Sequence, residues 1–178
     1  MDYGIRDIHN YPRKLARAIR HILSNNTVSN KNKLAILRFV SFVGVTEGRS
    51  LARQAFYAQH LERLAELLGK DFVDANEDDI HAVVAKVNTM TVRSFKNNGA
   101  ETTILKISDW TKEGYKITLK KFYRRLRKKH RGQCVETGWI QVKKIRSKIK
   151  ASDLLSPHEV KGTTRLISCP GYGHLEYS

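Results

Sequence analysis

The sequence predicts an all-α protein, and three features of its 178 residues support this prediction. Apolar residues recur at steps of three and four along several segments, which is the spacing of one face of a helix. Residues that cap or stop helices stand at the ends of these segments. Apolar residues also make up 40% of the chain, enough for the core of one ordinary domain. We therefore expect a small bundle of four core helices, with an extra N-terminal helix and a basic C-terminal extension.

Two helices are predicted near the N-terminal end. The first lies in YPRKLARAIRHIL, where Leu15, Ile19 and Ile22 fall on one face. A polar loop, SNNTVSNKN, separates it from a second helix in NKLAILRFVSFVGV, which Gly44 or Gly48 ends. The residues expected to form the buried stripe of this second helix are Leu34, Leu37, Val40 and Phe42.

The next two helices have signals both along their faces and at their ends. Residues 50–68 are expected to form one helix, with Gly69 as its C-terminal stop. Its apolar series is Leu51, Ala55, Ala58, Leu61, Leu64 and Leu68. Asn76 is the expected N-cap of the other helix, because three acidic residues follow it, where negative charge complements the helix dipole. The predicted buried face of that helix is Ile80, Val83, Val84 and Val87.

The segment TMTVRSFKNNGAETTILKIS is interpreted as a loop. Asn98 is followed by Gly99, which is a turn signal, and β-branched residues stand on both sides of this pair. A β-hairpin is therefore the alternative interpretation.

A fifth helix is predicted in WTKEGYKITLKKFYRRLRKKH, with Asp109 or Thr111 as its N-cap. Its apolar face consists of Tyr115, Leu119, Phe122, Tyr123 and Leu126. On the opposite side, a stripe at steps of four consists of Lys112, Lys116, Lys120, Arg124 and Lys128. Like charges at this spacing cost a helix roughly 0.2–0.5 kcal/mol per pair, and no acid stands between residues 115 and 131. The stripe therefore predicts contact with an anion.

The charge balance of the whole chain points to the same kind of partner. Thirty-three Lys and Arg face 17 Asp and Glu, a formal net charge of +16. This excess predicts a polyanionic partner, with nucleic acid first and an anionic membrane surface a distant second. Arg38 interrupts the most apolar stretch, and MDYGIRDIHN has no apolar signal core. We therefore expect a cytoplasmic protein with no membrane partner.

No constellation of catalytic or metal-binding residues is recognisable. Cys134 and Cys169 lack CxxC spacing, so neither a zinc site nor a disulfide framework is expected. The seven His residues are scattered, and no P-loop or GxSxG motif occurs. We expect no catalytic residue, no metal and no cofactor.

Several segments resemble the N-terminal core-binding domain of archaeal, Xer-like tyrosine recombinases (integrases). They are SNKNKLAILRFVSFVGVTEGRS, HLERLAELLGKDFVDANEDDIHAVVAKVN, WTKEGYKITLKKFYRRLR and GWIQVKKIRSKIKASDLLSPHEV, in that order. The most specific pieces are LAELLGKDFVDANEDDI, WTKEGYK and SDLLSPHEV. The resemblance implies a SAM-like helical bundle that clamps one side of a DNA duplex, while a separate catalytic domain clamps the other side and cuts it.

The resemblance also implies a domain organisation. Residues 1–28 would be an N-terminal basic arm or helix, residues 29–133 the core-binding domain, residues 134–160 a linker towards a missing catalytic domain, and residues 161–178 a diverged or truncated tail. The family's catalytic domain supplies an Arg, a Lys, an H-x-x-R motif and a nucleophilic Tyr. Only about two dozen residues follow Leu154, and no H-x-x-R precedes Tyr177. We therefore expect no enzymatic activity.

The predicted function is non-catalytic DNA binding associated with DNA integration and recombination. The resemblance places DNA contacts on two helices, and the candidate residues are Arg49, Arg53, Tyr57, Lys112, Lys116, Lys120, Arg124 and Lys128. Two alternatives remain open. In the first, the chain is part of a split active recombinase and pairs with other protomers or with a separate catalytic fragment. In the second, it is a generic nucleoid or RNA-binding basic protein.

Overall fold

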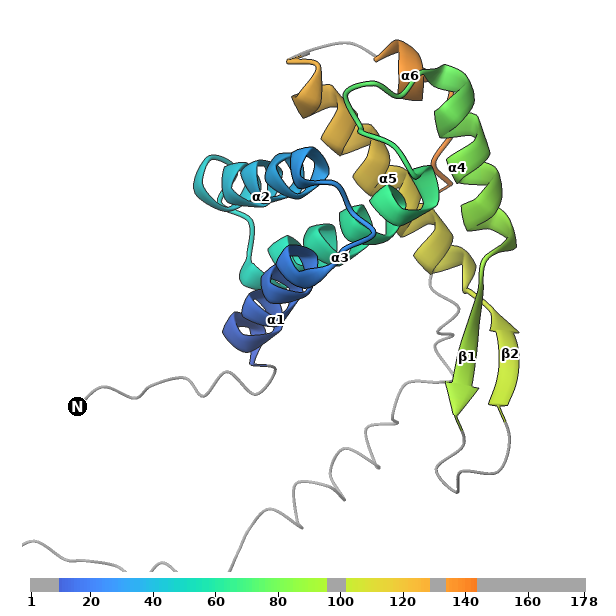
Figure 1. The fold of residues 1–178 in the computed structure, drawn as a ribbon, viewed down its shortest axis with the longest axis horizontal. Coiled ribbons are helices and arrows are strands. Elements are labelled where there is room, and N and C mark those ends of the chain that lie inside the picture. The colour runs from blue at the N-terminus through green and yellow to red at the C-terminus, as the bar shows by residue number, and fades with distance from the viewer. Residues whose placement is uncertain (1–9, 96–101, 129–133, 144–178) are drawn as a thin grey trace, which may run out of the picture. The chain divides into compact units, whose positions relative to one another are not determined.

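A computed structural model of the chain describes residues 10–95, 102–128 and 134–143. The elements, in order, are α1 (Tyr11–Ser24), α2 (Asn30–Val45), α3 (Leu51–Leu68), α4 (Glu77–Thr89), β1 (Thr91–Phe95), β2 (Thr102–Lys106), α5 (Asp109–Leu126) and α6 (Val135–Gly138) (Figure 1). Helices dominate and the only sheet in the described part has two strands, which confirms the all-α class. None of the described helices is both long and apolar enough to cross a membrane.

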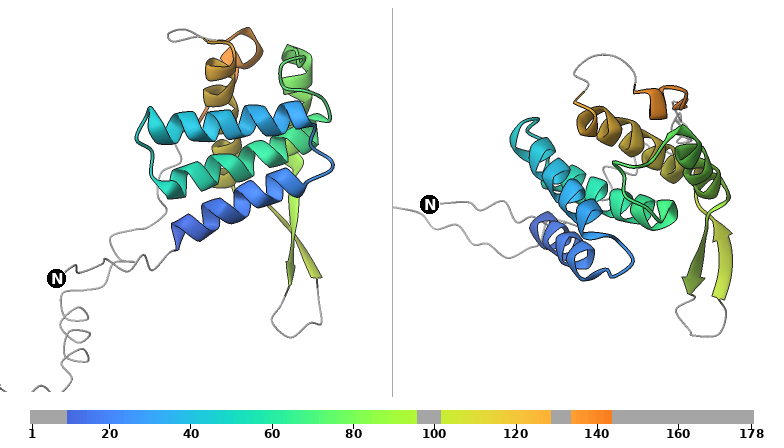
Figure 2. Two further views of the ribbon diagram at one scale, coloured as in Figure 1. Left: turned by 60° about the vertical axis from the view of Figure 1, so that its left-hand side comes forward. Right: turned by 45° about the horizontal axis from the view of Figure 1, so that its top comes forward.

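Helix α3 is the centre of the bundle. It lies between α1 and α2 and also packs against α4 and α5 (Figure 2). Helix α1 is part of this packing, because Ala18 and Ile22 on its inner face are buried. The domain boundary suggested at residue 29 therefore falls between two helices that share α3 as a neighbour. Most of the predicted linker, the tail at residues 161–178, and Cys169 and Tyr177 lie outside the described residues.

The ends of α3 and α4 are confirmed. Gly69 follows α3 with a φ of 70°, the left-handed conformation that glycine adopts most easily. Asn76 caps α4 in a reciprocal pair with Asp79, in which each side chain accepts a hydrogen bond from the other residue's backbone N–H, at 3.0 and 2.9 Å. The predicted cap of α5 is wrong: Ser108, not Asp109 or Thr111, accepts the backbone N–H of Thr111.

The predicted buried stripe of α2 is also wrong in phase. The residues buried on α2 are Asn32, Ile36, Phe39, Val40 and Val43. Leu34 is 49% exposed, and Leu37 and Phe42 are only half-buried. Both sides of α2 are apolar, so spacing alone does not select the side that α3 covers. Polar Asn32 settles the orientation, because its amide donates to Lys70 O at 2.9 Å and accepts from Phe72 N at 2.8 Å.

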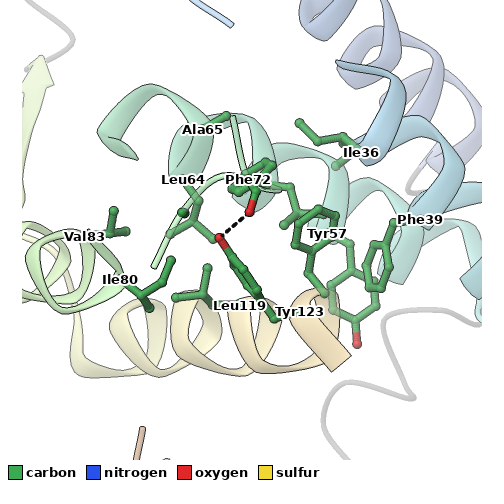
Figure 3. Packing of buried hydrophobic residues seen from close by; sticks show 14 of the residues in the cluster. Ile36, Phe39, Tyr57, Leu64, Ala65, Phe72, Ile80, Val83, Leu119 and Tyr123 are labelled. Carbon is green, nitrogen blue, oxygen red and sulfur yellow. Dashed lines mark hydrogen bonds between the residues drawn. The ribbon is translucent and has the colours of Figure 1, made fainter. Parts of the chain in front are cut away.

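The core forms where α2, α3, α4 and α5 meet (Figure 3). Of the six residues predicted in the core, Leu37 is only half-buried. The other five are buried: Leu61, Leu64, Val84, Leu119 and Phe122. The ring centroid of Phe122 lies 5.4 Å from that of Phe39 and 4.7 Å from that of Phe72. The Tyr123 hydroxyl donates to Phe72 O at 3.1 Å, and burial raises the pKa of Tyr123, so the hydroxyl keeps the proton that it donates.

The segment interpreted as a loop contains a β-hairpin, which confirms the alternative interpretation. Strands β1 and β2 are antiparallel, with Thr91 opposite Lys106 and Phe95 opposite Thr102. Asn98 and Gly99 lie between the strands, outside the described residues. The ribbon projects away from the helices in both views of Figure 2, and its residues Val92, Ile104 and Leu105 are exposed.

Residues 134–143, which we call the strap, pack against α4 and α5. The buried residues of the strap are Cys134, Thr137 and Ile140. The Trp139 ring stacks on the His81 ring of α4 with centroids 3.5 Å apart, and Lys120 Nζ on α5 donates to Ile140 O at 2.7 Å. The range predicted as a linker therefore begins as part of the folded unit.

Candidate nucleic-acid interface

A groove of about 620 Å³ lies between α2, the loop that follows α2, and α5. We call it the basic groove. It is lined by Phe39, Phe42, Glu47, Arg49, Ile117, Lys120, Lys121, Arg124, Arg125, Lys128 and Val142. Six of these residues are Lys or Arg and one is acidic, so the lining of the groove has a strong positive charge.

A second groove of about 460 Å³ adjoins the basic groove. We call it the side groove. It is lined by Lys31, Leu34, Ala35, Arg38, Phe39, Val73, Phe122, Arg125, Leu126 and Lys128. Four of these residues are cationic and none is acidic. Phe39, Arg125 and Lys128 line both grooves, so the cationic surface continues from one groove into the other.

Helix geometry explains which cations of α5 face the basic groove. A step of four residues turns an α-helix by 400°, about 40° more than a full turn. The three steps from Lys112 to Arg124 therefore turn the predicted stripe by about 120° around α5, and Lys128 lies beyond the end of the helix at Leu126. The α5 residues that line the basic groove are instead separated by alternating steps of three and one along the sequence. They are Ile117, Lys120, Lys121, Arg124 and Arg125.

The first three lysines of the predicted stripe are engaged inside the protein. Lys112 Nζ pairs with Asp109 Oδ1 at 3.0 Å, and Lys116 Nζ pairs with Glu113 Oε1 at 2.7 Å. Their side chains are only 19% and 16% exposed, and neither lines a groove. Lys120 lines the basic groove but holds the strap through its bond to Ile140 O.

The three residues predicted on α3 and its preceding loop are separated. Arg49 lines the basic groove. Arg53 is exposed, with its guanidinium 5.1 Å from the centroid of the Phe56 ring, but it lines neither groove. Tyr57 is only 5% exposed and packs edge-on against Phe39, so it offers almost no area to a ligand.

Four cations of the grooves were missing from the predicted site: Lys31, Arg38, Lys121 and Arg125. Lys31 and Arg38 lie seven residues apart on one face of α2, a helix without any acidic residue. A search of α2 for unbalanced charge would have found them. The Arg125 guanidinium lies 4.0 Å from the centroid of the Phe42 ring on α2, a cation–π contact that holds it over the groove.

Three cations at the C-terminal end of α5 carry no ion pair within the described residues: Arg124, Arg125 and Lys128. All three are exposed. They are therefore the side chains of the basic groove that are most available to an external anion. Their mutual repulsion falls when such an anion binds.

Glu47 is the acid of the basic groove. Its Oε2 accepts a hydrogen bond from Lys121 Nζ and lies 3.3 Å from Arg49 Nε. Burial on its own would raise the pKa of Glu47, but the hydrogen bonds and charges of Lys121 and Arg49 outweigh burial and hold this pKa below its usual value. The carboxylate is therefore ionised at neutral pH.

One titratable group with a strongly lowered pKa lies away from the grooves. His60 on α3 sits between the rings of Phe56 and Tyr115, with centroids 3.9 and 4.2 Å away. Burial lowers the pKa of His60 to about 4, so the ring is neutral and acts as a core side chain. Across the described ranges, no three His, Cys, Asp or Glu side chains form a group that could hold a metal ion.

Comparisons with known proteins return no match to a family model, a curated protein or a solved structure. The resemblance to archaeal tyrosine recombinases therefore rests on the sequence segments alone. The two grooves are features of this chain's own residues and do not depend on that resemblance.

Proposed function

We propose that the protein binds double-stranded DNA through the basic groove and the side groove, without cutting it, as a core-binding module in DNA integration and recombination. The observation that supports this proposal best is the lining of the basic groove, where six Lys or Arg face one Glu. The side groove adds Lys31 and Arg38 without adding an acid. A duplex carries one charge per about 1.7 Å of its axis, so a surface of this kind can neutralise several phosphates together.

Contacts to phosphates hold the duplex in place but do not read its sequence. Binding to unrelated duplexes of equal length is therefore expected to be similar. If about five phosphates are neutralised, log K falls against log salt with a slope of about −4 to −5. Fluorescence anisotropy with a labelled duplex over a salt series measures this slope. A slope near zero would contradict the proposal.

Charge reversal within the groove gives the sharper test. The variant R124E/R125E replaces two exposed cations of the basic groove. It should bind duplex more weakly and flatten the salt slope by roughly two units, because two phosphate contacts are lost. Circular dichroism checks that the helices remain, since neither side chain is buried.

The matched control is R17E/R20E, which makes the same charge change at two exposed positions of α1 that line neither groove. It should bind nearly as tightly as the parent. An equal loss in both double variants would mean that net charge, and not the grooves, carries the binding.

Two measurements separate the proposal from its alternatives. A covalent adduct between the protein and a nicked suicide duplex would show strand cleavage and support an active, split recombinase. Competition by RNA that displaces the labelled duplex at equal nucleotide concentration would favour a generic RNA-binding protein. Reversible, salt-sensitive binding that prefers duplex DNA is the result that we expect.

A further inference from the structure

Glu47 joins two sides of the basic groove. It lies in the loop between α2 and α3, and its Oε2 receives the hydrogen bond from Lys121 Nζ on α5. Arg49 Nε of the same loop lies 3.3 Å from that oxygen. One anionic oxygen is therefore held by two cations that come from different elements.

The loop that carries Glu47 and Arg49 is fixed by its own contacts. Arg49 N donates to Val43 O at 3.0 Å, and Gln54 Nε2 donates to Arg49 O at 2.8 Å. Gly48 has a φ of 60°, the left-handed conformation that favours glycine. These bonds hold the backbone of Arg49 without the Glu47 carboxylate, and Lys121 Nζ also lies 5.4 Å from the centroid of the Tyr57 ring.

A carboxylate and a phosphate offer the same kind of oxygen to such a site. Lys and Arg form charge-assisted hydrogen bonds with either group. The neighbouring groove residues Arg124, Arg125 and Lys128 pair with no carboxylate among the described residues. Glu47 is therefore the carboxylate that pairs with two cations of the basic groove, whereas these three neighbouring cations have no such partner.

We propose that Arg49 and Lys121 form a phosphate site of the DNA-binding surface, and that Glu47 occupies this site in the free protein. A DNA phosphate then binds there only by displacing the carboxylate. This inference rests on the proposed function. It goes further by assigning one phosphate site and an acid that competes for it.

The competition selects for polyanions. An attached carboxylate has a high effective concentration at the site, so a small free anion displaces it poorly. A duplex is held at the same time by other groove cations. Its phosphate therefore also has a high effective concentration at the site and competes with the Glu47 carboxylate more effectively than a free anion does. Glu47 lowers the affinity for every anion but lowers it most for small ones.

The first test is the variant E47Q. Removing the negative charge should raise the affinity for a labelled duplex about fivefold at 0.1 M salt and steepen the salt slope by about one unit. Inorganic phosphate should also displace the duplex at lower concentration from E47Q than from the parent. E47A should behave in the same way, and circular dichroism confirms the fold of each variant.

The matched control is E66Q. Glu66 also forms a close ion pair, with Arg63 at 2.6 Å, and lines neither groove. The control should leave duplex affinity unchanged. A similar gain in E66Q would show that net charge alone raises the affinity, which would overturn the assignment.

A double-mutant cycle separates occupation of the site from simple repulsion. In the background R49Q/K121Q, the change E47Q should give little or no gain, because the site that Glu47 occupied is gone. A full gain in this background would mean that Glu47 only repels DNA. A loss of affinity in E47Q would mean that Glu47 holds the cations in a productive position. Either result overturns the inference while the proposed function stands, whereas a parent protein without salt-sensitive binding would contradict both.

Discussion

Lys128 has a backbone conformation that suits glycine better than lysine. Its φ is 52°, immediately after α5 ends, and its backbone N–H donates to Arg125 O at 3.0 Å. A left-handed conformation costs a residue with a Cβ roughly 1 kcal/mol. Lys128 lines both grooves. The strained backbone conformation is therefore explained by the position of the lysine side chain in the grooves, and not by a preference of lysine for this conformation.

The variant K128G should therefore be more stable and bind more weakly. We expect the free energy of unfolding to rise by about 0.5–1 kcal/mol, because glycine adopts this conformation without strain. Duplex affinity should fall and the salt slope should flatten by about one unit. Urea denaturation and anisotropy measure the two effects. If K128G is less stable than the parent, the side chain makes a stabilising contact that outweighs the strain.

His60 makes the stability of the fold depend on pH. The groups around its ring are Phe56 and Arg53 on α3, and Tyr115 and Thr118 on α5. Burial lowers its pKa from 6.5 to about 4, so the unfolded chain binds a proton more readily than the folded chain. Its contribution is complete above pH 6.5 and is lost progressively as the pH falls towards 4.

The expected loss of stability between pH 7 and pH 4.5 is of the order of 2–3 kcal/mol. Urea denaturation at several pH values measures it. The carboxyl groups with lowered pKa values, such as Glu47 and Glu66, add their own loss mainly below about pH 4.5. The control H60F removes the titrating ring, and a pH dependence that persists in this variant would assign the effect to other groups.

Single residues also show which features of the fold and the site could be predicted from the sequence and which could not. Phe122 and Leu64 were predicted in the core because helical spacing marks the inner face of an amphipathic helix. Asn32 was not, because its partners Lys70 O and Phe72 N lie about forty positions further along the chain. Arg125 was not singled out as a site residue, because its position over Phe42 depends on how α2 crosses α5.

At the scale of elements, the strap is the main addition to the predicted fold. Half of its ten residues are apolar, but the residues that become buried do not follow hydrophobicity, because Thr137 is buried and Val135 is 78% exposed. Glu113 Oε2 accepts the backbone N–H of Lys143 at 2.8 Å, and Glu136 Oε1 pairs with Arg127 Nε at 2.7 Å. Contacts of this kind require α5 to be already folded, so they do not appear in local sequence.

The variant I140A tests whether the strap belongs to the fold. Ile140 is only 2% exposed, so its truncation should lower the free energy of unfolding by about 2–4 kcal/mol. The control V142A changes a residue that is 40% exposed and should cost far less. Thermal or urea denaturation compares the two. Equal, small effects would place the strap outside the cooperative unit.

At the scale of the whole described unit, charge is unevenly distributed as well as unbalanced. Five acids lie between the end of α3 and the first turn of α4: Asp71, Asp74, Glu77, Asp78 and Asp79. Asp71 pairs with Lys31 of the side groove at 3.3 Å, so this acidic segment borders that groove. The basic groove contains Arg124, Arg125 and Lys128, which form no ion pair among the described residues. We therefore expect a polyanion to approach the C-terminal end of α5 first, and this attraction raises the rate of productive encounters.

The β-hairpin lies at a position where the helical bundle should tolerate an insertion. Ile107 N donates to Met90 O at 3.2 Å, so the residues just before and just after the ribbon already meet. Among the described residues, the strands pack mainly on each other. The length of chain between α4 and α5 is therefore uncoupled from the spacing of the two helices. This position is suited to the insertion of a foreign domain or the attachment of a label, because the helices would keep their packing while the graft extends into solvent.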